Sequence, residues 1–242
     1  MFFRGSNKLL EKTMELIKKR AELVKIINEL GLKKGVEVGV AKGEFSEYLL
    51  KNSDLDVLYS IDAWSSDLEA MRAYRTSSLV ASVDNYYIKA KNRLSDFGKR
   101  SVMIKDISEN AVKQFEDESL DFIYLDASHL FSGFALDLIN WWKKLKWGGL
   151  FAGHDFRRKS TYQVSYAVNG FCMEHKQFYY LTTSDAGRKV NAVNPSWWLI
   201  KTKRDKGTWT KEFKQYKIDI KKQGDELNKY IKVDVIYECK NN

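Results

Sequence analysis

Short runs of β-branched and aromatic residues alternate with longer amphipathic segments through the middle of this 242-residue chain. The runs read GVEVGV, LYSIDAW, SVMIKD, LDFIYLD and LFAGHD, and segments with the helical spacing of apolar residues lie between them. Regular alternation of strands and helices predicts a mainly parallel sheet with helices on both of its faces. Because ligands bind such sheets at the carboxyl ends of the strands, the residues that follow these runs are the first candidates for a site.

Further helices, strands and helix ends are predicted around these runs. A helix is predicted over residues 7–30, where apolar residues recur at steps of three and four. Another helix is expected over residues 83–97, and FYYLTTS and SWWLIKTK near the C-terminus read as two additional strands. We expect Ser108 to be the N-cap of a short helix after SVMIKD, and Gly148-Gly149 to end the helix before LFAGHD.

Composition and charge exclude several classes of protein. Hydrophobic residues make up 44% and charged residues 30% of the chain, which is typical of a globular protein rather than a disordered one. No apolar run reaches membrane-spanning length and no secretory signal is recognisable, so we expect a cytoplasmic protein with no membrane partner. The two cysteines, Cys172 and Cys239, lack metal-ligand spacing and are expected to be reduced thiols. The net charge of +9 permits binding to nucleic acid, but the lysines are dispersed, which favours a solvated basic surface.

Two motifs indicate a nucleoside-binding edge. In the stretch from Glu37 to Gly43, a strand runs into a turn with glycines at Gly39 and Gly43, where the backbone can approach a ligand closely. An ordinary strand-to-helix turn explains this stretch about equally well, and the spacing is not that of a dinucleotide fingerprint. Asp62 ends the next strand, where a carboxylate can accept both hydroxyls of a ribose or cap a turn. Trp64 beside it packs either on an adenine or in the core.

A third motif is a pair of Asp/His sets at two successive strand ends. Asp126 and His129 lie in YLDASH, and His154 and Asp155 lie in GHDF. If these strands are neighbours, the four side chains converge. Carboxylate and imidazole ligands suit a divalent ion such as Mg²⁺, Mn²⁺ or Fe²⁺, and a histidine is a proton acceptor near neutral pH. A single histidine is more often structural, but two such sets favour a functional site.

Together these motifs resemble the class I S-adenosylmethionine-dependent methyltransferases, and more narrowly the methyltransferase domain 24 group. The resemblance rests on GVEVGVAKGEFSEYLL, LYSIDAW, SENA, DFIYLDASH, LKWGGLFAGHDF and NPSWWLIK, spanning roughly residues 35–201. It implies a Rossmann-like, doubly wound, mainly parallel seven-stranded sheet with a C-terminal antiparallel hairpin. We accordingly expect an N-terminal helix packed on the core (1–30), a methyltransferase domain (31–203) and a charged C-terminal extension of that domain (204–242).

The resemblance also implies a place for each part of S-adenosyl-L-methionine. The residues so implied are Glu37, Gly39 and Gly43 around the methionine portion, Asp62 at the ribose hydroxyls, Ala63 and Trp64 beside the adenine, Asp106 and Ile107 on its other side, and Asp126 under the sulfonium. The glycine motif lacks the middle glycine that is usual in the family.

In similar metal-dependent O-methyltransferases, the acid at the Asp126 position binds Mg²⁺ and the next strand end supplies two further ligands, here His154 and Asp155. A basic residue three positions after the first acid takes the proton of the acceptor, and this chain has His129 there. His154 departs from the usual Asp or Asn, which makes Mn²⁺ or Fe²⁺ candidates beside Mg²⁺.

The leading hypothesis is therefore O-methylation of a small hydroxyl-bearing, sugar-like acceptor, with metal assistance and with His129 and His154 as catalytic residues. A non-haem iron hydroxylase using the Asp/His cluster is the second hypothesis, and a nucleic-acid methyltransferase is the third. A cofactor-binding relative without chemistry is the fourth. The acceptor pocket is expected to be built from residues 65–82, 157–168 and 184–194.

Overall fold

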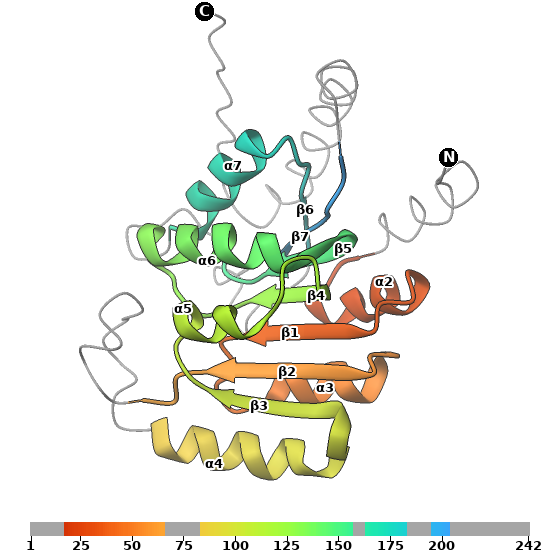
Figure 1. Cartoon of the computed structure of the whole chain (residues 1–242), viewed down its shortest axis with the longest axis vertical. Helices are drawn as coiled ribbons and strands as arrows, with labels where there is room; N and C mark the ends of the chain where they lie inside the picture. Colours follow the sequence, from red (N-terminus) through yellow and green to blue (C-terminus); the bar gives the residue numbers. More distant parts are fainter. Residues whose placement is uncertain (1–16, 66–82, 157–162, 183–194, 204–242) are drawn as a thin grey trace, which may run out of the picture.

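The fold is a single seven-stranded sheet covered by helices, seen in a computed structural model that describes residues 17–65, 83–156, 163–182 and 195–203 (Figure 1). The strand order is β3-β2-β1-β4-β5-β7-β6. The strands are β1 (Lys34–Val38), β2 (Val57–Asp62), β3 (Ser101–Lys105), β4 (Leu120–Leu125), β5 (Leu145–Gly153), β6 (Tyr180–Leu181) and β7 (Trp197–Ile200). Neighbouring strands from β3 to β5 are parallel, whereas β7 is antiparallel to both β5 and β6. This confirms the predicted Rossmann-like sheet with its C-terminal hairpin.

Helices cover both faces of the sheet. They are η1 (Arg20–Glu22), α2 (Leu23–Glu29), α3 (Glu44–Asn52), α4 (Val83–Leu94), η2 (Ser95–Arg100), α5 (Ser108–Ala111), η3 (Val112–Gln114), α6 (Phe131–Lys144) and α7 (Val164–Glu174). One core cluster joins α2 and α3 to side chains of the sheet such as Phe122, and the other joins α5, α6 and α7 to the opposite face at Ile123. Successive side chains of a strand point to opposite faces of the sheet. Val36 and Val38 lie on the face of α5, α6 and α7, so Glu37 between them points to the other face.

The predicted Gly-Gly helix stop is wrong. Helix α6 ends at Lys144, and Gly148 and Gly149 lie inside strand β5. A side chain at Gly149 would come within 2.9 Å of the backbone oxygen of Asp121, next to the point where the register between β4 and β5 shifts. Gly149 therefore allows β4 and β5 to approach each other closely where their register shifts, and glycine is common at such positions.

Three helix boundaries also differ from the sequence predictions. Ser108 is the first residue of α5 and Ile107 occupies the N-cap position, because the Ser108 hydroxyl donates a hydrogen bond to Asp137 instead. The helix expected over 7–30 begins at Arg20 within the described residues, and its part before residue 17 lies outside them. The helix expected over 83–97 ends at Leu94 and continues as a 3₁₀ turn.

Other expectations fall outside the described residues. These are the excursion over 65–82, nearly all of it beyond the described ranges, and the extension after residue 203. Within the described part of the chain, no helix combines the length and apolarity needed to cross a bilayer. The division into residues 1–30, 31–203 and 204–242 stays a prediction, although α2 is packed into the core through Leu23, Ile26 and Ile27.

Candidate functional site

The candidate residues lie in a row along the edge where the parallel strands end. Backbone N–H groups extend the ladder past the strands: Gly39 donates to Ile61, Asp126 to Val38, and His154 to Leu125, at 2.7–3.0 Å. Gly39, Asp126 and His154 thus each follow the last residue of β1, β4 and β5, and these three strands are neighbours in the sheet (Figure 1). The two Asp/His sets converge because β4 and β5 are neighbours in the sheet, which is the condition that the sequence leaves open.

The turn between β1 and α3 requires glycine at its first position. Gly39 has φ +92°, and a Cβ built there would lie 2.1 Å from the backbone oxygen of Asp126. Gly43 has φ +77° and lies at the N-cap of α3, with Ala90 of α4 packed 3.2 Å from the place of its Cβ. The middle position, usually glycine in the family, is Ala41 in a left-handed conformation with φ +49°.

Glu37 lies beneath this turn rather than on the open edge. Its side chain is 2% exposed and accepts a hydrogen bond from the hydroxyl of Ser46 on α3, which also contacts Ser60 at 2.8 Å. Burial raises the pKa of Glu37 to about 8, so the carboxyl is mostly protonated at neutral pH. The contact of Glu37 with Ser46 supports the helix that follows the turn.

Asp62 fixes the same turn from strand β2. Its Oδ2 accepts the N–H groups of Val40 and Ala41, and its Oδ1 accepts that of Trp64, each at 2.9 Å. Burial raises the pKa of Asp62, while these three donors oppose the shift. The indole of Trp64 is only 2% exposed, donates to the backbone oxygen of Ala41 and packs against Tyr87. Of the two alternatives for Trp64, the core is the one observed.

The end of β3 carries the next part of the edge. Asp106 donates its N–H to the backbone oxygen of Asp62, and its Oδ1 accepts the N–H of Ile107 and the side-chain amide of Asn110. The carboxylate thereby fixes the loop between β3 and α5. Ala63 follows Asp62 on the neighbouring strand, so these residues border one section of the edge.

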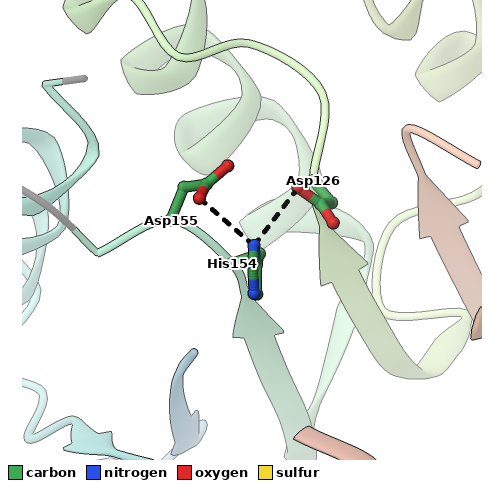
Figure 2. Close-up of side chains that lie close together, drawn as sticks. All are labelled: Asp126, His154 and Asp155. Carbon is green, nitrogen blue, oxygen red and sulfur yellow. Dashed lines mark ion pairs between the residues drawn. The ribbon is translucent and has the colours of Figure 1, made fainter. Parts of the chain in front are cut away.

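The Asp/His cluster occupies the ends of β4 and β5. Nε2 of His129 lies 2.7 Å from Oδ2 of Asp155, and Nδ1 of His154 lies 3.3 Å from Oδ1 of Asp155. Figure 2 shows the imidazole of His154 between the two carboxylates, with Oδ1 of Asp126 at 3.8 Å. Asp155 has φ +52°, a conformation that costs free energy for a residue with a side chain and is frequent at functional sites.

The electrostatics of the cluster separate its two carboxylates. Burial raises the pKa of Asp126 to about 6, against the opposing effect of His154. Burial alone would also raise the pKa of Asp155, but the close contacts with His129 and His154 hold that pKa well below its usual range. Burial would lower the pKa of His154, yet Asp155 and Asp126 raise it. Asp155 therefore stays ionised at neutral pH and attracts cations, including metal ions.

Residues 36–156 match a family model described as a methyltransferase domain, and this match covers half of the chain. The chain belongs to this family. The family places it among the class I S-adenosylmethionine-dependent methyltransferases, so the protein is a methyltransferase that uses S-adenosylmethionine.

Solved structures are similar to the methyltransferase in fold. An O-methyltransferase from Bacillus cereus in complex with SAH has a TM-score of 0.54 at 12% identity, covering 81% of this chain and 90% of that one. The N-methyltransferase NodS from Bradyrhizobium japonicum WM9 has a TM-score of 0.51 at 14% identity, covering 76% and 95%. No match was found among curated proteins. At these identities the likeness extends to the fold alone.

The methyltransferase carries a set of donors that fits a divalent ion. Asp126, His154 and Asp155 each present one ligand atom, and these atoms lie within 4.8 Å of one another. Two carboxylates and one imidazole form a donor set suited to Mn²⁺, Mg²⁺ or Fe²⁺. Within the described residues, His129 contacts a carboxylate of this set rather than completing a facial arrangement of two histidines and one carboxylate. That geometry disfavours the iron hydroxylase hypothesis.

Sequence reasoning missed two charged residues, Arg20 at the Asp/His cluster and Asp137 in the core of α5 and α6. Arg20 of η1 reaches Asp126 from the N-terminal segment, with Nη1 3.6 Å from Oδ2. Asp137 of α6 accepts the hydroxyl of Ser108, which in turn accepts the indole N–H of Trp141. A carboxylate on the apolar face of α6 is a signal that could have revealed Asp137, whereas Arg20 is one basic residue among many.

The buried carboxyl of Asp137 is expected to make the stability of the methyltransferase depend on pH. Burial raises its pKa to about 7, compared with 3.8 for an exposed aspartate. Because the folded protein binds this proton more tightly than the unfolded chain, the contribution of Asp137 to the free energy of unfolding is largest below about pH 4. This contribution falls by on the order of 4 kcal/mol as pH rises from about 4 to 7. Asp137→Asn cannot ionise and should remove this component, which urea unfolding between pH 4 and 8 measures; an unchanged pH profile would contradict it.

Proposed function

We infer that this methyltransferase transfers the methyl group of S-adenosylmethionine to a hydroxyl of a small, sugar-like acceptor. The observation that carries the inference is the contact of 2.7 Å between His129 and Asp155 beside Asp126, at the ends of adjacent parallel strands. A histidine held by a carboxylate is suited to accept a hydroxyl proton near neutral pH. A hydroxyl acceptor needs such a base, because its oxygen becomes a good nucleophile only as its proton leaves.

The cofactor would lie across the strand ends. Asp106, Ile107 and Ala63 would border the adenine, Asp62 would accept one of the ribose hydroxyls, and the turn at Gly39 and Gly43 would adjoin the methionine portion. Three backbone donors already bind Asp62. A carboxylate has about four acceptor positions, so capacity remains for a ribose hydroxyl. Trp64 would contribute from below, as a rigid support of the turn at Ala41.

The reaction is a displacement in line with the sulfur. S-adenosylmethionine supplies an electrophilic methyl group, and the acceptor oxygen bonds to this carbon as the carbon–sulfur bond breaks. Asp126 would lie beneath the sulfonium, where its charge favours the cation. His129 would receive the hydroxyl proton, and Asp155 would stabilise the imidazolium that forms. Orientation of the two reactants at the strand ends would supply much of the rate.

Asp126, His154 and Asp155 would hold a divalent ion, Mg²⁺ or Mn²⁺. Such an ion lowers the pKa of a bound hydroxyl and so favours its deprotonation. The contact of His129 with Asp155 would orient one ligand carboxylate, as partners of metal ligands commonly do.

Calorimetric titration of S-adenosylhomocysteine, followed by transfer of labelled methyl from S-adenosylmethionine to a panel of sugars, catechols and amines, tests this function. We expect micromolar binding, roughly −8 kcal/mol, and transfer to hydroxyl acceptors that is supported by Mg²⁺ or Mn²⁺ and lost in EDTA. Asp155→Asn should lower metal affinity, with Asp137→Asn as a control outside the cluster.

Other results would redirect the assignment. Methyl transfer that persists in EDTA would exclude a metal requirement and leave His129 as the general base. Transfer to amines alone would overturn O-methylation. Salt-sensitive methylation of RNA or DNA would replace the small acceptor by a nucleic acid.

A further inference from the structure

We propose that Arg20 binds the carboxylate of the amino-acid portion of the cofactor, which makes the N-terminal segment part of the cofactor site. The proposal rests on S-adenosylmethionine as the methyl donor and is independent of the acceptor and of the metal. It is carried by the position of Arg20 along the strand ends, by its contacts, and by the charges around it.

The position follows from the dimensions of the sheet. Neighbouring strands lie about 4.8 Å apart, so the edge from β3 to β4 is roughly 14 Å long. With the adenine near Asp106 on β3 and the ribose at Asp62 on β2, the amino-acid portion extends to the ends of β1 and β4. Gly39 and Asp126 mark this point, and their backbones are in close contact there.

Arg20 lies at that same point. Its Nη1 is 3.6 Å from Oδ2 of Asp126, and its guanidinium lies over the ring of Phe45, 5.0 Å from the centroid. Phe45 belongs to the first turn of α3, two residues after Gly43. The arginine thus spans β4 and the start of α3, the two elements that enclose the end of the cofactor. With 37% of its side chain exposed, it is accessible to a ligand.

A carboxylate bound at the ends of β1 and β4 needs a positively charged side chain nearby. Asp126 is the acid that pairs with Arg20, and it suits the ammonium and the sulfonium of the cofactor but repels its carboxylate. Lys42, a cation of the neighbouring turn, lies over the ring of Tyr86 on α4 instead. A carboxylate at the ends of β1 and β4 would therefore find its counter-charge in Arg20.

The geometry of arginine suits this task. The planar guanidinium binds a carboxylate through two parallel hydrogen bonds and remains charged at any physiological pH. Its separation of 3.6 Å from Asp126 exceeds the 2.7–2.9 Å of a close charge-assisted hydrogen bond. Stacking on Phe45 holds the plane of the group in place before the ligand arrives.

The test compares two ligands in calorimetry: S-adenosylhomocysteine, and S-adenosyl-3-thiopropylamine, which keeps the ammonium and lacks only the carboxylate. We expect Arg20→Gln to weaken S-adenosylhomocysteine roughly 10- to 150-fold, the range of a charge-assisted hydrogen bond, and to change the thiopropylamine less than about threefold. The wild-type protein should bind the thiopropylamine correspondingly more weakly than S-adenosylhomocysteine.

Arg100→Gln is the matched control, because Arg100 binds backbone oxygens of Ser53 and Leu55 away from the cofactor edge. It should leave the ratio of the two affinities unchanged. If Arg20→Gln does not fold, Arg20→Lys keeps the charge without the paired donors, and the same selective loss for S-adenosylhomocysteine is expected.

Equal weakening of both ligands by the Arg20 variant would assign the arginine to positioning Asp126 and overturn the proposal. A wild-type protein that binds neither ligand would overturn the cofactor assignment itself. These two failures are therefore distinguishable.

Discussion

Gly39→Ala is expected to unfold the protein or to lower its free energy of unfolding by at least about 4 kcal/mol, beyond the usual range for a single substitution. The new Cβ would lie 2.1 Å from the oxygen and 2.4 Å from the carbon of the Asp126 carbonyl, and neither is a flexible group. A φ of +92° adds strain for any residue with a side chain. The displaced backbone belongs to the end of β4, so binding of S-adenosylhomocysteine should be lost as well. Urea unfolding and calorimetry measure the two effects.

Gly31→Ala provides the matched control for this prediction. Gly31 also has a positive φ, of +63°, but a Cβ there would have no neighbour within 4 Å. Its substitution should cost about 1–2 kcal/mol, which is the left-handed strain alone, and leave ligand binding intact. Equal destabilisation by the two variants would show that the contact with Asp126 does not decide the requirement for glycine.

The mainly parallel sheet could be predicted because it depends on patterns that extend over many residues. Alternating strands and helices specify a parallel sheet, and the structure shows that β4 and β5 lie side by side, which the sequence leaves as a condition. Once they do, Asp126 and His154 must be neighbours, because each follows the end of its strand. Part of the candidate site was therefore a consequence of topology.

The contacts that could not be predicted depend on single side chains and local backbone geometry. Gly148-Gly149 has the composition of a helix stop, and only the register shift between β4 and β5 reveals that strand packing requires it. Ser108 has the composition of an N-cap, but the buried Asp137 competes for its hydroxyl. The place of Arg20 depends on how the chain enters α2, for which the basic N-terminal sequence offers no distinguishing pattern.

Trp64 and Glu37 show that residues of a cofactor-binding motif can support the backbone of the site instead of contacting the ligand. Both belong to stretches that resemble cofactor-binding motifs, yet both side chains are buried beneath the turn. Glu37 contacts Ser46 and Trp64 contacts Ala41, so each supports the backbone that a ligand would meet. A motif in the sequence therefore marks the neighbourhood of a site more reliably than it marks the atoms that touch the ligand.

His129→Ala is expected to lower turnover by about 10²- to 10⁴-fold, the usual contribution of a general base, with any hydroxyl acceptor identified in the transfer assay. Affinity for S-adenosylhomocysteine should change little, because His129 contacts Asp155 on β5 rather than the turn at Gly39. The loss should therefore appear in kcat, as measured by steady-state kinetics together with calorimetry on the same preparation.

His175→Ala is the matched control, since His175 lies at the end of α7 and packs against Trp142 and Phe171, away from the strand ends. It should affect stability while leaving kcat near that of the wild type. If His129→Ala keeps full turnover, the acceptor proton leaves by another route and Asp155 serves only to orient or bind. If both His129→Ala and Asp155→Asn lose turnover to the same extent and the double variant loses no more, the two residues act as one unit, as their contact of 2.7 Å predicts.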